Sequence, residues 1–282
     1  MSLVSMSTIL SRAEQGNYGV GAFSVANMEM IMGAIQAAEE CSSPIILQVA
    51  EVRLPYSPLA LLGPMMLAAA KEASVPVAVH FDHGLSIEVI KEALELGFTS
   101  VMMDASHLPI DQNIEMVKKV KKLADNYGAS VEAEVGQLGG SEDGSTDLEM
   151  FFSDPKEVKQ LYEQTGVDAV ALSIGNAHGL YKKEPKLKFS ILEETKEIVQ
   201  VPLVLHGGSG ISAEDFRHCI RLGIRKVNIA TANFLSVEAA ARDYCREDKR
   251  DYFKLSASMV QGMKRNVIEH INIFQSNDKA WR

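Results

Sequence analysis

Short apolar runs rich in β-branched residues alternate with longer amphipathic stretches eight times along the chain. Near-continuous apolar runs are typical of parallel strands buried on both faces, and the stretches between them have the periodicity of helices. The expected strands span residues 18–23, 45–49, 77–81, 100–103, 130–135, 169–174, 203–205 and 226–229. The expected helices span residues 29–40, 59–73, 87–96, 112–127, 154–164, 190–199, 213–222 and 234–245. Eight strand–helix units predict an α/β protein with a parallel sheet.

Two segments of the chain resemble each other at a constant offset. Residues 75–106 align without gaps to residues 201–232, so that Pro76 matches Pro202 and His80 matches His206. Each copy predicts a strand, a helix and a strand, and the copies begin at the third and seventh expected strands. A barrel made of two equivalent halves has this symmetry, and an open sheet does not; chance similarity between two such units is the alternative. We therefore expect a (β/α)8 TIM barrel.

No linker rich in proline, glycine or serine divides the chain. We expect residues 1–282 to form a single (β/α)8 domain with its active site at the C-terminal ends of the strands. An extra C-terminal helix, expected over residues 257–274, is apolar on one side, at Met259, Met263, Val267 and Ile271. Because that side needs burial, the helix is expected at or near a subunit interface, or else packed on the barrel. Methionines at positions 28, 30, 32, 65 and 66 are expected in the core.

The balance of charges excludes several classes of function. The formal net charge is −9, so no basic field attracts nucleic acid or an anionic membrane. No apolar run approaches the roughly 18 residues that cross a bilayer, and the first ten residues lack the pattern of a signal peptide. The three cysteines are far apart, which predicts neither a disulfide framework nor a thiolate zinc site. We expect a cytoplasmic protein with a small-molecule substrate.

Three histidines, each followed by a glycine, stand at the ends of the third, sixth and seventh expected strands: His83, His178 and His206. Facing one another across the mouth of a barrel, they could supply three imidazoles to one metal ion and leave positions open for substrate, as in catalytic zinc sites. His80 is expected to point into the barrel as a supporting group. The histidines at positions 107, 218 and 270 fall on helices or loops and are not expected in the site.

Carboxylates accompany these histidines. Asp82 directly precedes His83 and is expected to act as an acid/base on a metal-bound substrate; support of a metal ligand is the alternative. Glu132 and Glu134 alternate along the fifth strand and so face the same side. Buried carboxylates need partners, and Asp104 could share a cation with Glu134.

Two turns after the seventh and eighth strands suit an anion. Residues 206–210 (HGGSG) offer backbone amides without Cβ obstruction and one hydroxyl, and residues 228–231 (NIAT) precede a helix N-terminus. Phosphate sites recur at these places in barrels. The polar, glycine-rich residues 137–147 (QLGGSEDGSTD) follow the fifth strand and are either a surface loop or a lid that carries Glu142 over the mouth.

With these residues in view, the chain resembles class II fructose-bisphosphate and tagatose-bisphosphate aldolases from about Ser7 to the C-terminus. The motifs that carry the resemblance are AVHFDHG (78–84), SVMMDASHLP (100–109), SVEAEVGQLGGSEDG (130–144), GNAHGLYKKEP (175–185), LVLHGGSGI (203–211) and KVNIAT (226–231). Their combination and order are highly specific. The resemblance implies reversible, zinc-dependent cleavage of a ketose (bis)phosphate to dihydroxyacetone phosphate and an aldehyde, through an enediolate that the cation stabilises. From the apolar side of residues 257–274 we also expect a homo-oligomer, a homodimer or homotetramer.

The resemblance implies a role for each matching residue. The zinc ligands are His83, His178 and His206, and Asp104 and Glu134 can hold zinc in an alternative position. Asp82 is the acid/base at the C4 oxygen, and Glu142 is the loop carboxylate that handles the C3 proton. The groups that bind the dihydroxyacetone phosphate part of the substrate are Gly179, Lys182, Gly207, Gly208, Ser209, Asn228, Ile229, Ala230 and Thr231. Main-chain oxygens near Gly179 and Gly207 are candidates for a monovalent cation, Na⁺ or K⁺.

Departures from the family pattern leave the aldehyde open. Ala230 stands where many fructose-type enzymes have aspartate, whereas Tyr181 and Lys182 resemble the fructose-type branch. After the second strand, Glu51 disfavours a second phosphate nearby and Arg53 favours an anion. The alternatives to an aldolase are another metal-dependent sugar-phosphate enzyme of the barrel type, an isomerase or epimerase, and a non-catalytic aldolase-like subunit.

Overall fold

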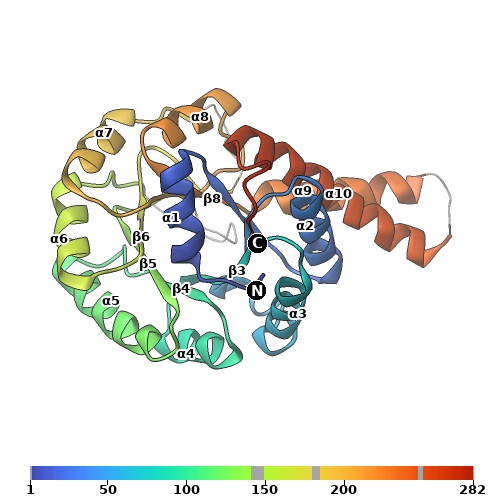
Figure 1. The fold of residues 1–282 in the computed structure, drawn as a ribbon, viewed down its shortest axis with the longest axis horizontal. Helices are drawn as coiled ribbons and strands as arrows, with labels where there is room; N and C mark the ends of the chain where they lie inside the picture. Colours follow the sequence, from blue (N-terminus) through green and yellow to red (C-terminus); the bar gives the residue numbers. More distant parts are fainter. Residues whose placement is uncertain (1, 141–148, 180–184, 247–249, 282) are drawn as a thin grey trace.

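The computed structural model describes residues 2–140, 149–179, 185–246 and 250–281, and these contain a closed barrel of parallel strands (Figure 1). Each strand pairs with the next, and β8 pairs with β1. The strands are β1 (Val20–Ser24), β2 (Ile45–Ala50), β3 (Val77–Gly84), β4 (Ser100–Met103), β5 (Ser130–Val135), β6 (Ala169–Leu172), β7 (Leu203–Leu205) and β8 (Ile224–Ile229). The predicted (β/α)8 TIM barrel with an extra C-terminal helix is confirmed.

Helices follow each strand and form the outer ring (Figure 1). They are α2 (Met28–Glu40), α3 (Leu59–Glu72), α4 (Ile87–Leu96), α5 (Ile110–Asp125), α6 (Pro155–Thr165), α7 (Phe189–Ile198), α8 (Ala213–Arg221), α9 (Thr231–Arg246) and α10 (Tyr252–Phe274). A short 3₁₀ helix, η1 (Glu51–Arg53), lies between β2 and α3. Differences from the expected bounds at the mouth of the barrel include β3, which continues to Gly84, β6, which ends at Leu172 instead of residue 174, and α9, which begins at Thr231 instead of residue 234.

Side-chain caps fix where several helices begin. The Asn27 side chain accepts a hydrogen bond from the Met30 amide at 3.0 Å, and the Ser212 hydroxyl accepts one from the Asp215 amide at 3.1 Å. Such caps satisfy amides that have no partner within the helix. At the opposite ends, Gly97 and Gly166 take the left-handed conformation that terminates α4 and α6. Caps of these two kinds therefore set the ends of these helices.

A helix that the sequence analysis did not predict closes the amino-terminal end of the barrel. Helix α1 (Met6–Gly16) crosses the centre of the barrel in Figure 1. Its apolar side, which includes Met6, Ile9 and Leu10, is fully buried against inward-facing strand residues such as Ala22 and Ile46. The expected helices begin at residue 29, so this amphipathic segment is an addition to the predicted fold.

The C-terminal helix packs on its own chain. Met263, Val267 and Ile271 are fully buried in the core, and α10 lies against α2, where Met263 closely approaches Gly33. The apolar side that was expected to need a partner is therefore covered within the chain. The first turns of α10 and the end of α9 instead project from the barrel as a helical hairpin (Figure 1). Tyr252 and Phe253, at the start of α10, are 72% and 81% exposed.

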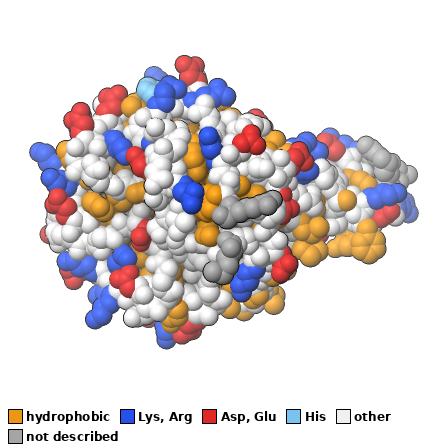
Figure 2. Space-filling view, viewed as in Figure 1, with side chains coloured by type: hydrophobic (Ala, Val, Ile, Leu, Met, Phe, Trp, Pro, Cys, Tyr) orange, Lys and Arg blue, Asp and Glu red, His pale blue; other side chains and the backbone are white. Residues whose placement is uncertain are grey.

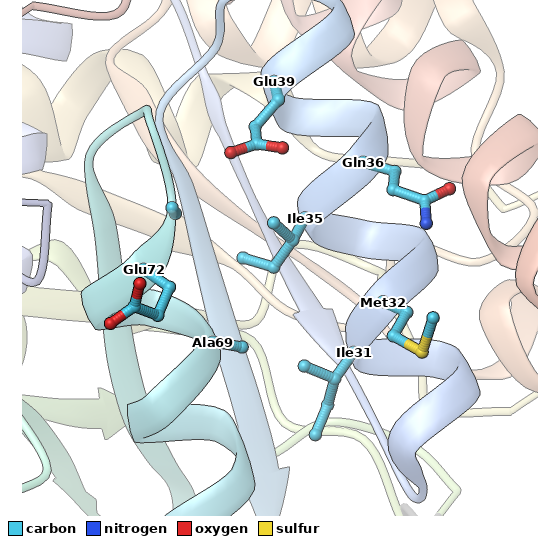
Figure 3. A pocket seen from close by; sticks show the side chains of 8 residues that line it. Ile31, Met32, Ile35, Gln36, Glu39, Ala69 and Glu72 are labelled. Carbon is cyan, nitrogen blue, oxygen red and sulfur yellow. The ribbon is translucent and has the colours of Figure 1, made fainter.

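The methionine prediction was partly wrong. Met30 and Met66 are buried, but Met28, Met32 and Met65 lie on the outer faces of α2 and α3, where Met28 is 52% exposed. Met32 lines a groove between these two helices together with Ile35 of α2, and Ala69 and Glu72 of α3 form the opposite wall (Figure 3). A helix can carry apolar residues on its outer face as well as on the face that packs against the sheet. Sequence periodicity alone did not distinguish these two faces in α2 and α3.

Among the described residues, no helix is long and apolar enough to cross a membrane.

Candidate functional site

The carboxyl ends of β3, β6 and β7 bring three imidazole rings together. His83 lies at the end of β3, His178 lies in the loop after β6, and His206 directly follows β7. The ring of His83 is centred 4.8 Å from that of His178 and 4.6 Å from that of His206. One nitrogen from each ring lies within 4.8 Å of the others. The structure therefore brings the three histidine rings together, as predicted.

The backbone at His83 lets two consecutive residues face the same cavity. Side chains of a regular strand alternate between faces, so Asp82 and His83 should point apart. The pairing of β3 with β4 shifts register between Phe81 and Gly84, and His83 has a left-handed φ of 43°. Such a conformation is strained for a residue with a side chain and is often found at functional sites. Both Asp82 and His83 are buried as a result.

Carboxylates orient two of the three rings. An Asp104 oxygen lies 2.7 Å from Nδ1 of His83. On β5, Glu132 Oε1 lies 2.7 Å from His206 Nε2, and Glu134 Oε2 lies 3.1 Å from His206 Nδ1. The prediction that Glu132 and Glu134 face the same side agrees with these contacts. A carboxylate that accepts the N–H of one ring nitrogen directs the other nitrogen toward a metal ion.

Burial and the neighbouring charges separate the protonation of the three rings. Burial lowers the pKa of His178 well below its usual range, and the charges of His83 and His206 lower it further. Burial also acts to lower the pKa of His206, but hydrogen bonding to Glu132 and Glu134 outweighs it and raises the pKa to about 9. At neutral pH the His178 ring is therefore unprotonated, whereas a cation that binds His206 would have to displace a proton.

Asp82 is held by amide side chains from β2 and β8. Gln48 Nε2 on β2 donates to Asp82 Oδ2 at 2.9 Å, and Asn228 Nδ2 on β8 donates to Asp82 Oδ1 at 3.0 Å. His80 Nε2 lies 3.6 Å away, which places His80 inside the barrel as predicted. Burial alone would raise the pKa of Asp82, but His83, His80 and a buried lysine lower it well below its ordinary value. The carboxylate is thus ionised at neutral pH beside the three rings.

The donor set fits a zinc ion. Imidazole nitrogens and carboxylate oxygens are the ligands that zinc takes in catalytic sites, and three protein ligands leave room for substrate. His83, His178 and His206 form one group of mutually close donor atoms, and His83, Asp104 and Glu134 form a second, overlapping group. The two groups correspond to the two predicted positions of the ion.

The predicted anion-binding turns lie at the same mouth. Gly207 has a left-handed φ of 61°, and a Cβ there would clash with the Ala177 carbonyl oxygen. The Gly208 amide donates to the Asn228 carbonyl at 3.1 Å, and the Ser209 hydroxyl accepts from the Ala232 amide in the first turn of α9 at 3.0 Å. These bonds bring the turns after β7 and β8 side by side.

The remaining residues of the second turn lie at the start of α9. Ile229 is buried, and Ala230 and Thr231 are partly exposed where the helix begins. Asn228 differs from the expectation, because its side chain faces Asp82 and not the turn. The amides of this turn, more than the Asn228 side chain, are suited to meet an anion.

The described ends of the glycine-rich segment are joined to the site. Gln137 and Phe151 exchange backbone hydrogen bonds at 2.8 Å, and the His178 amide donates to the Gly139 carbonyl at 2.9 Å. Gly179, with a left-handed φ of 84°, follows His178 at the mouth. Glu142 and Lys182 lie outside the described residues.

Comparison with known proteins assigns the chain to a family. The family model "Fructose-bisphosphate aldolase class-II" matches residues 4–279. The chain belongs to the class II fructose-bisphosphate aldolase family. It is 40% identical to the fructose-bisphosphate aldolases of Geobacillus stearothermophilus and of Staphylococcus aureus (strain Mu50 / ATCC 700699), over 99% of this chain and 99% and 100% of theirs. The crystal structure of the YdjI aldolase from Escherichia coli K12 superposes with a TM-score of 0.89 at 33% identity, covering 99% of this chain and 100% of that one. The predicted carbon–carbon lyase is confirmed.

The aldolase site contains buried residues that the sequence analysis did not single out. Gln48 and Lys226 each interrupt an apolar strand, and both side chains are completely buried. A buried amide or ammonium must be hydrogen bonded, so a polar residue in the middle of such a strand was the available signal. The sequence analysis predicted that Glu132 faces the same side as Glu134 but assigned it no role in the site.

Proposed function

We propose that this class II aldolase cleaves a ketose phosphate reversibly to dihydroxyacetone phosphate and an aldehyde, with a zinc ion held by His83, His178 and His206. The observation that carries the proposal is the convergence of these three imidazoles at the mouth of the barrel, where Asp82 is buried and ionised next to His83. A zinc ion there would polarise the substrate ketone and stabilise the negative charge that develops when the C3 proton leaves.

The chain's own residues would carry the proton transfers. Asp82 would take the proton from the C4 hydroxyl during cleavage and return it during condensation, while Gln48 and Asn228 hold its carboxylate in place. Glu142 would exchange the proton at C3, as the family resemblance implies. Asp104 and Glu134 would hold the ion in a second position.

The phosphate of the substrate would lie between the turns after β7 and β8. The Ser209 amide and the start of α9 would supply hydrogen-bond donors there, while the Gly208 amide stays bonded to the Asn228 carbonyl and holds the two turns together. Substrate contacts are also proposed for the other residues of this group: Gly179, Lys182, Asn228, Ile229, Ala230 and Thr231. The carbonyl oxygens of Gly179 and Gly207 are candidates for a monovalent cation, Na⁺ or K⁺.

The two alternative functions are not favoured. Relatives that match over essentially the whole chain are named aldolases. An isomerase or epimerase of sugar phosphates is distinguishable from an aldolase, because it would release no triose phosphate. A non-catalytic subunit has no need for a buried cluster of histidines and carboxylates.

We propose that residues 1–282 work as one domain and that the enzyme is a cytoplasmic homodimer or homotetramer. The hairpin of α9 and α10 supports an oligomer: Tyr252 and Phe253 are exposed there, and hydrophobic side chains gather along one side of the projection (Figure 2). An apolar projection of this kind is typical of a protein–protein contact.

The test of the function is product formation. The purified, zinc-loaded enzyme is incubated with dihydroxyacetone phosphate and a panel of aldehydes, and cleavage of each product is followed with a dehydrogenase that detects triose phosphate. The proposal expects metal-dependent release of dihydroxyacetone phosphate from at least one ketose phosphate. Interconversion of sugar phosphates without carbon–carbon cleavage would contradict it.

A further inference from the structure

A lysine lies at the centre of the barrel, beneath the proposed metal site. Lys226, on β8, is completely buried. Its ammonium lies 2.8 Å from Glu132 Oε2 on β5 and donates to Asn228 Oδ1 at 2.8 Å. These two partners are the residues that contact His206 and Asp82 respectively. One buried cation therefore connects a proposed zinc ligand with the proposed acid/base.

The first connection fixes a carboxylate. Glu132 uses one oxygen for Lys226 and the other for His206 Nε2 at 2.7 Å. With both oxygens engaged, the carboxylate accepts the Nε2–H of His206, and Nδ1 is the nitrogen directed into the site. Without the ammonium, Glu132 Oε2 would be left with His80 Nε2 at 3.8 Å, and the buried carboxylate could turn away from His206.

The second connection fixes an amide. A lysine ammonium has three donors and no acceptor, so the Asn228 oxygen must face Lys226. The Asn228 NH₂ group must then face Asp82, where it lies 3.0 Å and 3.3 Å from the two carboxylate oxygens. If the amide turned over, its oxygen would face the Asp82 carboxylate and repel it. Lys226 thus selects the amide orientation that holds the ionised acid/base.

We propose that Lys226 is a positioning residue for both parts of the aldolase reaction: through Glu132 it orients His206 toward the metal ion, and through Asn228 it orients Asp82 toward the substrate. The inference rests on the proposed function of these residues. Lys226 is buried below the substrate site, so its effect is exerted through its two partners.

The neighbouring residue provides a matched control. Arg225 precedes Lys226 on β8, is also almost completely buried, and also pairs with a carboxylate, since its Nε lies 2.7 Å from Glu14 on α1. Because consecutive strand residues face opposite sides, Arg225 points away from the barrel interior. Removing either cation takes one partner from a carboxylate, since Glu14 keeps Lys196 and Glu132 keeps His206, but only Lys226 contacts the residues of the site.

The test compares Lys226→Met with Arg225→Met. For each variant, zinc content, kcat per bound zinc, KM and thermal stability are measured, and the zinc affinity of the metal-free protein is measured by competition with a chelator. We expect Lys226→Met to lower kcat per bound zinc or zinc affinity by the 10- to 100-fold that is typical of losing a residue behind a metal ligand, with little change in KM. Arg225→Met should lose thermal stability and keep wild-type kcat per bound zinc.

A spectroscopic measurement separates positioning from a general loss of stability. In metal-free protein with ¹⁵N-labelled histidine, the Nε2–H of His206 should give a downfield proton signal from its short hydrogen bond to Glu132. That signal should move or disappear in Lys226→Met and remain in Arg225→Met. If Lys226→Met is too unstable to purify, Lys226→Met combined with Glu132→Gln removes both buried charges, and its kcat per bound zinc should still be low because Asn228 lacks its donor.

The inference would be overturned if Lys226→Met kept the wild-type kcat per bound zinc, zinc affinity and His206 signal. It would also be overturned if the double variant kept the wild-type kcat per bound zinc. Failure of the proposed function would look different, because the wild-type enzyme itself would then show no zinc-dependent cleavage.

Discussion

Nε2 of His206 lies 2.7 Å from Oε1 of Glu132, and both side chains are completely buried. Because Glu132 accepts the proton of Nε2, a metal ion must bind at Nδ1. Burial lowers the pKa of His206, but hydrogen bonding to Glu132 and Glu134 raises it above the usual range, to about 9. The metal-free enzyme therefore holds a proton where the metal ion is expected to bind, and two measurable quantities follow from that proton.

We predict that zinc affinity rises with pH up to about pH 9. Below that pH the ion must displace one proton from His206, so affinity should fall about tenfold per pH unit, or roughly 100-fold between pH 9 and pH 7. Titration calorimetry in buffers of different ionisation enthalpy measures the proton released. Zinc affinity that is constant between pH 7 and pH 9, with no proton release, would contradict this account.

The stability of the metal-free protein should change in the opposite direction. The pKa of His206 is raised on folding, so its contribution to stability is complete below about pH 6.5 and is lost as pH rises through about 9. Urea unfolding of the metal-free enzyme at pH 6.5 and pH 9.5 should show the loss. A His206→Gln variant serves as control, because its stability should lack this component of the pH dependence.

Removing the metal ion should abolish cleavage, and zinc should restore it. His83→Ala, His178→Ala and His206→Ala should each lose metal, because the three rings supply one cluster of donor atoms. Metal content is measured together with activity after chelation and reconstitution. Full activity in a chelated protein without metal would exclude a zinc-dependent reaction.

The barrel and the convergence of the histidines could be predicted because both depend on strand periodicity. Parallel strands place their carboxyl ends at one mouth, so His83, His178 and His206 had to lie near each other once the barrel was correct. Asp82 is a different case. Regular alternation would have turned it away from His83, and only the register shift and left-handed backbone at His83 bring both residues into one cavity.

The orientation of individual side chains could not be predicted from the sequence. Nothing in the NIAT motif shows that Asn228 turns its amide to Asp82, because that depends on a lysine two residues earlier on the same strand. The C-terminal helix was predicted from its apolar side, but periodicity could not say whether α2 or another subunit covers Met263. Long-range packing decides both questions.

Glu51 should limit which aldehydes the enzyme accepts. It directly follows Ala50, which pairs with Asp82 in the sheet. Its carboxylate accepts hydrogen bonds from the backbone amides of Leu85 at 2.7 Å and Ser86 at 3.1 Å, just before α4. These donors could otherwise meet an anion. We predict that Glu51→Gln raises kcat/KM for a phosphorylated aldehyde, relative to a neutral one, on the order of tenfold, the effect of about 1.4 kcal/mol of charge repulsion.

The control for Glu51 is the exposed Glu88 in the first turn of the same helix. Glu88→Gln removes the same charge without freeing the Leu85 and Ser86 amides, so the ratio of the two aldehydes should stay near the wild-type value. An equal change in both variants would assign the effect to net charge and not to the Glu51 contact.

The projecting hairpin should be a contact between subunits. Tyr252 and Phe253 are the most exposed hydrophobic residues of its α10 side, so we predict that Tyr252→Lys combined with Phe253→Glu yields a smaller species by light scattering at micromolar concentration. Tyr127→Glu, an exposed aromatic at the end of α5, should leave the oligomer unchanged. A wild-type enzyme that is monomeric under these conditions would reject the proposed oligomer.

Asp82→Asn should separate the two halves of the aldolase reaction. Asn is nearly isosteric with Asp, so the variant should fold and retain zinc, and one side-chain oxygen remains to accept from Gln48 or Asn228. It cannot take a proton from the C4 hydroxyl. Carbon–carbon cleavage should therefore fall by the roughly 10²- to 10⁴-fold that is typical of losing a positioned acid/base.

Exchange of the C3 proton of dihydroxyacetone phosphate should survive better in the same variant, because the zinc ion and Glu142 are proposed to carry that step. Glu142→Gln should show the reverse pattern, with exchange impaired at unchanged zinc content. Tritium exchange and cleavage are therefore measured on both variants with zinc quantified in each. If Asp82→Asn loses both activities equally while zinc is retained, then Asp82 acts in both half-reactions, and the assignment of the C3 proton to Glu142 alone is wrong.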